Sequence, residues 1–234
     1  MADILSIGRI TLLALADSVN PCAIAVLAMV LMTILIQNPD KRKKVFFGGL
    51  AFSLAIYIGY LLYGIVIVQF FRTFAEAMRS NAQYIYSGLA VLAMIFGALN
   101  IKDFFFYKKG SLGTEMPIWM RPKAKRLIEK ITSPAGAFII GLLVTLFLLP
   151  CTIGPYIVAS GILSELGILG ALPWLLYYNF IFILPMLVIT FVVYFGFTEV
   201  ERVSGWKDKN IRILHLIAGI LLFLAGLALL VGWL

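Results

Sequence analysis

Long apolar runs separated by short polar segments dominate the pattern of this chain. A bilayer core about 30 Å thick requires roughly 20 apolar residues per helical crossing, and these runs are far longer than the strands of a membrane barrel. We therefore expect an all-α membrane protein with no separate soluble domain. The runs predict six spanning helices, at approximately 7–36, 45–71, 83–106, 134–163, 171–197 and 211–233.

Composition agrees with this pattern, because 62% of the residues are hydrophobic, 13% are charged and the mean hydropathy is +1.04. The net charge of +8 comes mainly from the loops after the first, third and fifth spans. Arg9, Arg72 and Arg79 are the only basic residues elsewhere. The positive-inside rule then predicts a multi-pass plasma-membrane protein with both termini extracytoplasmic. Charge placed in this way sets topology and contacts anionic lipid, so we expect the bilayer, and no nucleic acid, as its partner.

Three spans in each half indicate a duplication. Adding 129 to a position in the first half superimposes the second and third runs on the fifth and sixth. An odd number of spans inverts the second copy, which predicts two inverted repeats and alternating access. The single membrane domain, 1–234, would then comprise repeat one at about 1–107, a linker at about 108–133 and repeat two at about 134–234. Any six-span chain with evenly spaced loops shows some match of this kind, which is the alternative.

Two Pro-Cys pairs lie at equivalent positions of these halves, in Asn20-Pro21-Cys22 and Leu149-Pro150-Cys151. Proline removes a backbone donor and clashes with the preceding turn, so each pair predicts a kink or a break in its helix. Asn20 is a suitable N-cap, and each cysteine then lies in the first turn of a half-helix. The positive end of the helix dipole favours the thiolate, the form that attacks disulfides, whereas apolar burial opposes it.

Cys22 and Cys151 are the only cysteines in the chain. A single membrane cysteine is usually a packing residue, but two that follow proline at matching depths favour a redox-active pair. A disulfide needs the two Cα atoms within about 4.4–6.8 Å. Small residues such as Gly154 after Cys151 allow membrane helices to approach that closely.

These features resemble the CcdA/DsbD family of transmembrane thiol-disulfide electron transporters, in particular its short CcdA-like form. The resemblance rests on six spans, Pro21-Cys22 in the first span, and Pro150-Cys151-Thr152 with Pro155 in the fourth. It implies that cytoplasmic thioredoxin reduces a Cys22–Cys151 disulfide, and that an extracytoplasmic thioredoxin-like protein then re-oxidises the dithiol. In that family the electrons serve cytochrome c maturation and disulfide reduction. Unlike Cys151, Cys22 is followed by no later proline in its helix.

Other polar or helix-bending residues in the runs are candidates for supporting roles. Asp17 is a carboxylate inside the first run, where it could cap the break, face water or handle protons. Pro185 is a candidate hinge in the fifth run, and Thr152 accompanies Cys151. His215, the only histidine, is expected to pack, since no metal-ligand set surrounds it.

Two other function classes stay open at this point. Paired thiolates bind soft metal ions, so a soft-metal transporter is one alternative, although it normally has more sulfur or imidazole ligands. A small-solute carrier with incidental cysteines is the other. A quinone-linked disulfide generator would need additional loop cysteines. We expect neither a cofactor nor a resident metal, and we classify the activity as a thiol-disulfide oxidoreductase-type electron carrier.

Overall fold

The computed structural model describes residues 7–19, 21–38, 41–77, 82–107, 117–131, 133–196 and 200–231. Every regular element in these ranges is helical. The helices are α1 (Ile7–Ser18), α2 (Pro21–Gln37), α3 (Arg42–Ala77), α4 (Ala82–Phe105), α5 (Arg121–Ile128), α6 (Pro134–Leu163), the short 3₁₀ turn η1 (Ser164–Leu166), α7 (Gly167–Tyr194) and α8 (Val200–Leu230). The chain is therefore an all-helical protein, as predicted.

Each predicted apolar run contains a helix, or in the first run the pair α1 and α2. Four helical stretches in the described ranges are long and apolar enough to cross a bilayer, or five if α1 and α2 form one bent span. These stretches are Arg42–Thr73, Ser87–Phe105, Gly154–Tyr194 and Asp208–Ala228. The structure thus supports a multi-pass protein with four to five candidate spans, and six crossings remain a prediction.

In the first apolar run α1 ends at Ser18 and α2 begins at Pro21, and a proline kink between them remains a prediction. The axes of Ile10–Ser18 and Cys22–Gln37 differ by 49°. In contrast, α6 runs through Pro150 without interruption, so the predicted start of a new half-helix there is not observed. Neighbouring groups can satisfy the carbonyl that a membrane proline leaves without a donor, which allows a helix to continue. Gly167, which has a positive φ of 67°, caps the end of η1 and is the first residue of α7.

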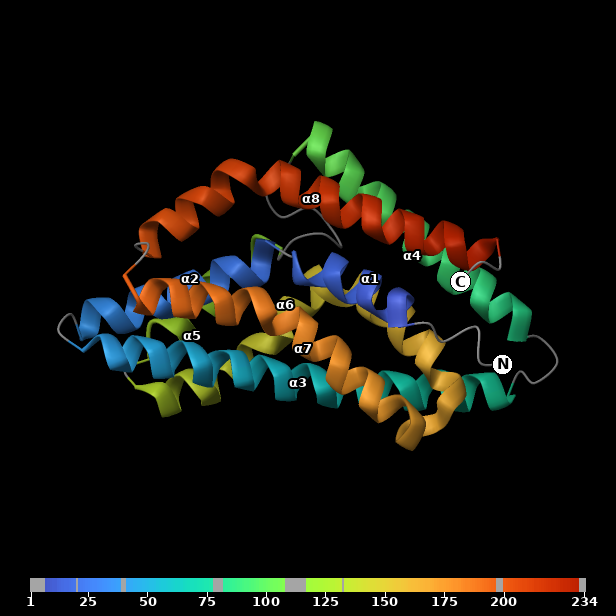
Figure 1. Cartoon of the computed structure of the whole chain (residues 1–234), viewed down its shortest axis with the longest axis horizontal. Coiled ribbons are helices and arrows are strands. Elements are labelled where there is room, and N and C mark those ends of the chain that lie inside the picture. The colour runs from blue at the N-terminus through green and yellow to red at the C-terminus, as the bar shows by residue number, and fades with distance from the viewer. Residues whose placement is uncertain are drawn as a thin grey trace.

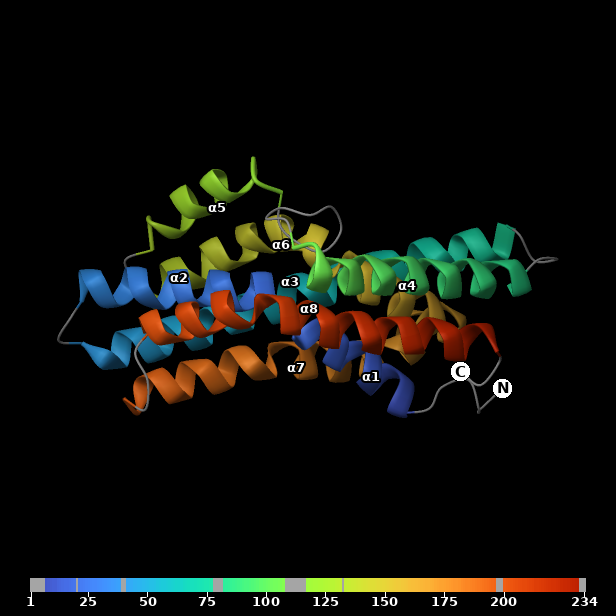
Figure 2. The same ribbon diagram turned by 90° about the horizontal axis from the view of Figure 1, so that it is seen from above.

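The helices form two layers of close contacts. In one, α3 packs against both α6 and α7; in the other, α4 packs along α8, with α1 and α2 between the layers (Figure 1, Figure 2). The start of α3, α5, the end of α7 and the start of α8 gather at one end of the molecule. The described basic residues in this group include Lys43 and Lys44 of α3 and Arg121 and Lys125 of α5.

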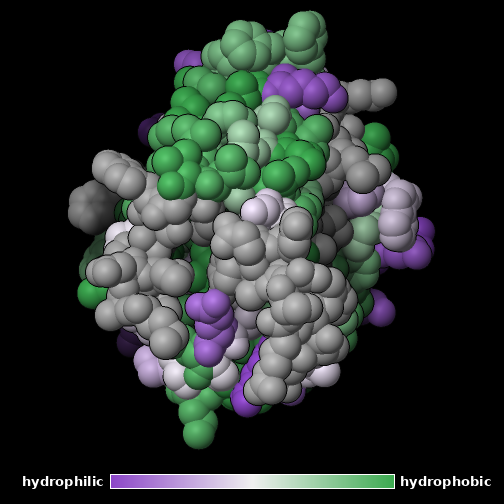
Figure 3. Space-filling model, turned by 90° about the vertical axis from the view of Figure 1, so that its right-hand side faces the viewer, coloured by the Kyte–Doolittle hydropathy of each residue, from purple (hydrophilic) through white to green (hydrophobic). Residues whose placement is uncertain are grey.

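The opposite end contains the end of α3, the start of α4 and the corner between α6 and α7 (Figure 1). Its described surface combines apolar patches with isolated hydrophilic side chains (Figure 3). The side of the membrane that each end of the molecule faces remains a prediction.

Glycines bring the backbones of α4 and α8 into close contact. A Cβ added at Gly97 would lie 2.7 Å from the Phe223 nitrogen, and one at Gly219 would lie 2.8 Å from the Ile101 nitrogen. Real Cβ atoms do not approach so closely, so a side chain at either position would push the two helices apart. Small residues at membrane helix interfaces allow this backbone-to-backbone packing.

Candidate functional site

Cys22 lies in the first turn of α2, immediately after the break, as the sequence predicted. Its side chain is 9% exposed and belongs to the apolar core, together with Ala23 and Val26 of the same helix. Asn20, the expected N-cap, lies outside the described residues, and so does the side chain of Pro21. This cysteine is therefore shielded by the helices in the conformation seen here.

Cys151 lies within α6, the helix that packs against α3. Its side chain and that of Pro150 lie outside the described residues, so the approach of its sulfur to that of Cys22 remains a prediction. The next residue, Thr152, is fully buried. Its Oγ1 and the Tyr60 hydroxyl of α3 form a hydrogen bond of 2.7 Å, and Oγ1 is also 3.3 Å from the Leu148 carbonyl oxygen. The segment around Cys151 is thus attached to α3.

Gly154 and Pro155, the other two candidates in the segment around Cys151, are both buried. A Cβ at Gly154 would lie 2.9 Å from Cγ of Phe96 on α4, so glycine permits the close approach of α6 to α4. Pro155 follows it inside the continuous helix. Gly154 thus packs against α4, while the predicted close approach of α6 to the helix of Cys22 remains a prediction.

Asp17 is buried in the last turn of α1, five positions before Cys22, with 1% of its surface exposed. The Tyr178 hydroxyl of α7 lies 3.1 Å from its Oδ2 and 3.4 Å from the Leu13 carbonyl oxygen. No described residue forms a hydrogen bond with Oδ1. Asp17 thus neither faces water nor caps the break in the described part of the chain, and its observed partner is a tyrosine.

Three tyrosines join the surroundings of Asp17 to those of Thr152. The ring of Tyr156 lies edge to face with those of Tyr178 and Tyr60, at centroid distances of 5.3 and 5.5 Å. The Tyr156 hydroxyl donates to the Tyr60 carbonyl oxygen and accepts from Asn179 Nδ2 at 3.3 Å. A buried polar and aromatic chain therefore runs from beside Cys151 to the segment that precedes Cys22.

Sequence reasoning did not identify Tyr60, Tyr156, Tyr178 or Asn179. Like Asp17, each of these residues has a hydrogen-bonding side chain inside an apolar run. Burying such a group is costly unless it has a hydrogen-bond partner, so this feature could have indicated them. These residues could not be distinguished from other tyrosines near the span ends, because the choice depends on which helices pack together.

Pro185 and His215 complete the set of sequence candidates. Pro185 lies inside α7, and the helix continues through it. A hinge at this proline remains a prediction. His215 is buried in α8, and its Nδ1 is 2.9 Å from Oδ1 of Asn100 on α4. The histidine therefore packs between helices, as predicted. In the described ranges no group of three or more His, Cys, Asp and Glu side chains is arranged to hold a metal ion.

Comparison with known proteins identifies one matching family model. The family described as "Cytochrome C biogenesis protein transmembrane region" matches residues 9–228. This range includes both cysteines and all the helices that surround them. No curated protein and no solved structure matches the chain.

Proposed function

This chain belongs to the family of cytochrome c biogenesis protein transmembrane regions, and we propose that it carries reducing equivalents across the membrane through a disulfide between Cys22 and Cys151. The observation that carries the proposal is that the family match covers nearly the whole chain, including its only two cysteines. The position of Cys22 supports it, because this cysteine lies in the first turn of α2, beside the junction with α1.

The proposed cycle transfers two electrons and two protons at each end. A thiolate of reduced cytoplasmic thioredoxin attacks one sulfur of the disulfide, forming a mixed disulfide and releasing the other cysteine as a thiolate, which takes a proton. The second thiol of thioredoxin resolves the mixed disulfide, leaving oxidised thioredoxin and the membrane dithiol. The dithiol then reduces the disulfide of an extracytoplasmic thioredoxin-like protein by the same steps in reverse.

We further propose that two inverted repeats of three spans expose the cysteines to the two sides alternately. Their helix contacts support this relationship, since α4 of the first repeat packs along α8 of the second, and α3 packs against α7. These are the pairs that the repeat makes equivalent. The basic end of the molecule would face the cytoplasm, and both termini the opposite side.

Supporting roles are proposed for residues around the pair. Thr152 and Asp17 attach the cysteine-bearing segments to α3 and α7 through Tyr60 and Tyr178. Gly154 allows α6 to approach α4. Asn20 would cap the start of α2, and the helix-bending residues would permit movement. The residues proposed for that movement are Pro21, Pro150, Pro155 and Pro185.

The test is mass spectrometry of the purified protein, with alkylated thiols counted before and after incubation with reduced thioredoxin. We expect no alkylated cysteine before incubation and two afterwards. The Cys22→Ser and Cys151→Ser variants are the controls, and each should show one reactive thiol throughout. If both wild-type cysteines react from the start and thioredoxin changes nothing, a soft-metal or small-solute carrier takes precedence.

A further inference from the structure

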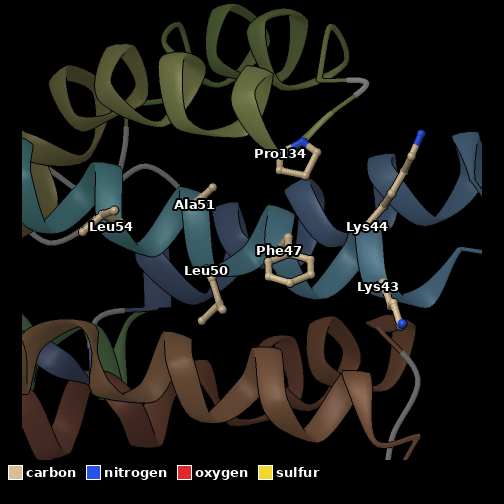
Figure 4. A pocket seen from close by; sticks show the side chains of 7 residues that line it. All are labelled: Lys43, Lys44, Phe47, Leu50, Ala51, Leu54 and Pro134. Atoms are coloured by element: carbon tan, nitrogen blue, oxygen red, sulfur yellow. The ribbon is translucent and has the colours of Figure 1, made fainter.

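A groove at the basic end of α3 is not used by the proposed electron transfer. It has a volume of about 460 Å³ and lies where α3 adjoins the start of α6 (Figure 4). Lys43 and Lys44 lie at one end, and apolar side chains form the rest of it. These apolar residues are Phe47, Leu50, Ala51, Leu54 and Pro134.

The groove follows one face of α3. Lys43, Phe47, Leu50 and Leu54 are spaced by four, three and four positions, which places them in a row along a helix. At 1.5 Å per residue the row is about 16 Å long. Phe47 and Leu54 are 55% and 52% exposed, so the row is open to the surroundings of the protein. An occupant must therefore be elongated and largely apolar.

The end of the groove that is lined by Lys43 and Lys44 is positively charged and favours an anion. Lys43 is exposed, and among the described residues neither it nor Lys44 forms an ion pair with a carboxylate. Lys44 Nζ donates to Asn38 Oδ1 at 2.9 Å, which leaves an ammonium group with further donors. The side chains of these consecutive lysines extend to opposite sides of α3 at the end of the groove (Figure 4). Positive charge at the end of an apolar groove is complementary to a negative head group attached to a hydrocarbon chain.

We infer that this groove binds an anionic phospholipid of the surrounding bilayer. The phosphate contacts Lys43 and Lys44, and one acyl chain lies along Phe47, Leu50 and Leu54. The groove belongs to Arg42–Thr73, a candidate membrane span, so lipid is the molecule that surrounds it. A soluble anion would engage the lysines alone and leave the apolar row uncovered. The site also joins α3 to the first residue of α6, and it does not depend on the proposed electron transfer.

The experiment is native mass spectrometry of the full chain in detergent, titrated with phosphatidylglycerol. Each lysine near anionic lipid contributes about 1 kcal/mol, so the K43Q/K44Q variant should weaken binding about tenfold or more. The K43R/K44R variant keeps the charge and should bind like the wild type. The A51F variant fills the groove without changing the charge and should also lose binding. Phosphatidylcholine should bind more weakly than phosphatidylglycerol to the wild type.

The matched control is the K125Q/R126Q variant, which removes two positive charges from exposed positions of α5. It should bind phosphatidylglycerol within twofold of the wild type. Equal weakening in K125Q/R126Q and K43Q/K44Q would mean diffuse attraction to a basic surface and would overturn the site. Unchanged binding by A51F would also overturn it. So would full displacement of the lipid by inorganic phosphate, since the lysines would then be a site for a soluble anion.

Discussion

The Tyr178 hydroxyl lies 3.1 Å from Oδ2 of Asp17 and joins α7 to the last turn of α1, although 161 positions separate the two residues. Both side chains are buried. A carboxyl group that has one partner in an apolar interior depends on that partner, because an unpartnered buried polar group is costly. The end of α1, and with it the break that precedes Cys22, is therefore held by a tyrosine from the other half of the chain.

Removing this hydroxyl should destabilise the protein. We expect Tyr178→Phe to lower the free energy of unfolding by about 1–3 kcal/mol, the cost of leaving a buried acceptor without its donor. In the Asp17→Leu background the same substitution should cost much less, because the acceptor is already absent. Thermal unfolding of the four proteins in one detergent measures this coupling.

Tyr177 provides the matched control. Its hydroxyl also joins α7 to α1, through Thr11 Oγ1 at 2.9 Å, but this contact is exposed. Tyr177→Phe should therefore change the free energy of unfolding less than Tyr178→Phe does. If the two substitutions lower the free energy of unfolding equally, burial does not increase the contribution of the Asp17 contact to stability.

The hydrogen bond beside Cys151 should affect both stability and reactivity. Thr152→Val removes the hydrogen bond between Oγ1 and the Tyr60 hydroxyl at a fully buried position, and we expect a loss of about 1–3 kcal/mol. Thr152→Ser keeps the hydroxyl and should retain most of the stability. If the contact positions Cys151 for exchange, the rate at which thioredoxin opens the disulfide should fall in the valine variant and not in the serine variant. Stopped alkylation time courses distinguish the three proteins.

A methyl group in the seam between α4 and α8 should separate these helices. Gly97→Ala places a Cβ against the backbone of Phe223, and overpacking of this kind typically costs about 1–3 kcal/mol. Gly88→Ala lies in the same helix, where an added Cβ meets no described atom within 4 Å. It should be neutral or slightly stabilising. A similar loss of melting temperature in both variants would contradict the role of close backbone packing.

Single-cysteine variants should trap the exchange with thioredoxin. The remaining cysteine of each single-cysteine variant is first converted to its mixed disulfide with 5-thio-2-nitrobenzoate, which a thioredoxin thiolate displaces as it forms a new disulfide. If Cys22 receives the attack, Cys151→Ser combined with a thioredoxin that lacks its resolving cysteine should accumulate this adduct on Cys22. The reciprocal result would assign the attack to Cys151. Non-reducing electrophoresis and peptide mapping identify the linked residue, and no adduct on either cysteine would contradict the proposed mechanism.

The proposed topology makes opposite predictions for two exposed sites. In a Cys22→Ser, Cys151→Ser background, Glu165→Cys lies at the corner between α6 and α7, and Lys125→Cys lies on α5. An impermeant maleimide should label the first in intact cells and the second only after permeabilisation. The reverse labelling pattern would mean that the protein has the opposite orientation in the membrane.

Much of the fold could be predicted because apolar run length and charge placement are properties of the chain itself. The break before Pro21 was equally readable, since asparagine and proline together indicate a helix start. The uninterrupted course of α6 through Pro150 was not, because helix continuity at a proline depends on the groups that neighbouring helices supply.

The partners of the buried polar groups could not be predicted either, because they also depend on which helices are neighbours. Tyr178 approaches Asp17 across 161 positions, and Asn100 approaches His215 across 115. Helices that are apolar all round give no periodic pattern to show which side faces which neighbour. The sequence therefore indicated Asp17 and His215 as polar residues inside apolar runs and left open which helices would supply their partners.

We expect the glycine seam between α4 and α8 to limit which parts of the molecule move. The backbones of α4 and α8 are in contact at Gly97 and Gly219, with no layer of side chains between them at these points. We expect such close packing to resist sliding of one helix along the other. We expect α4 and α8 to form a stationary frame, while the shorter segments α1 and α2, and α6 beside α3, shift against it. A covalent cross-link between α4 and α8 would then leave turnover intact, whereas one between α1 and α7 would arrest it.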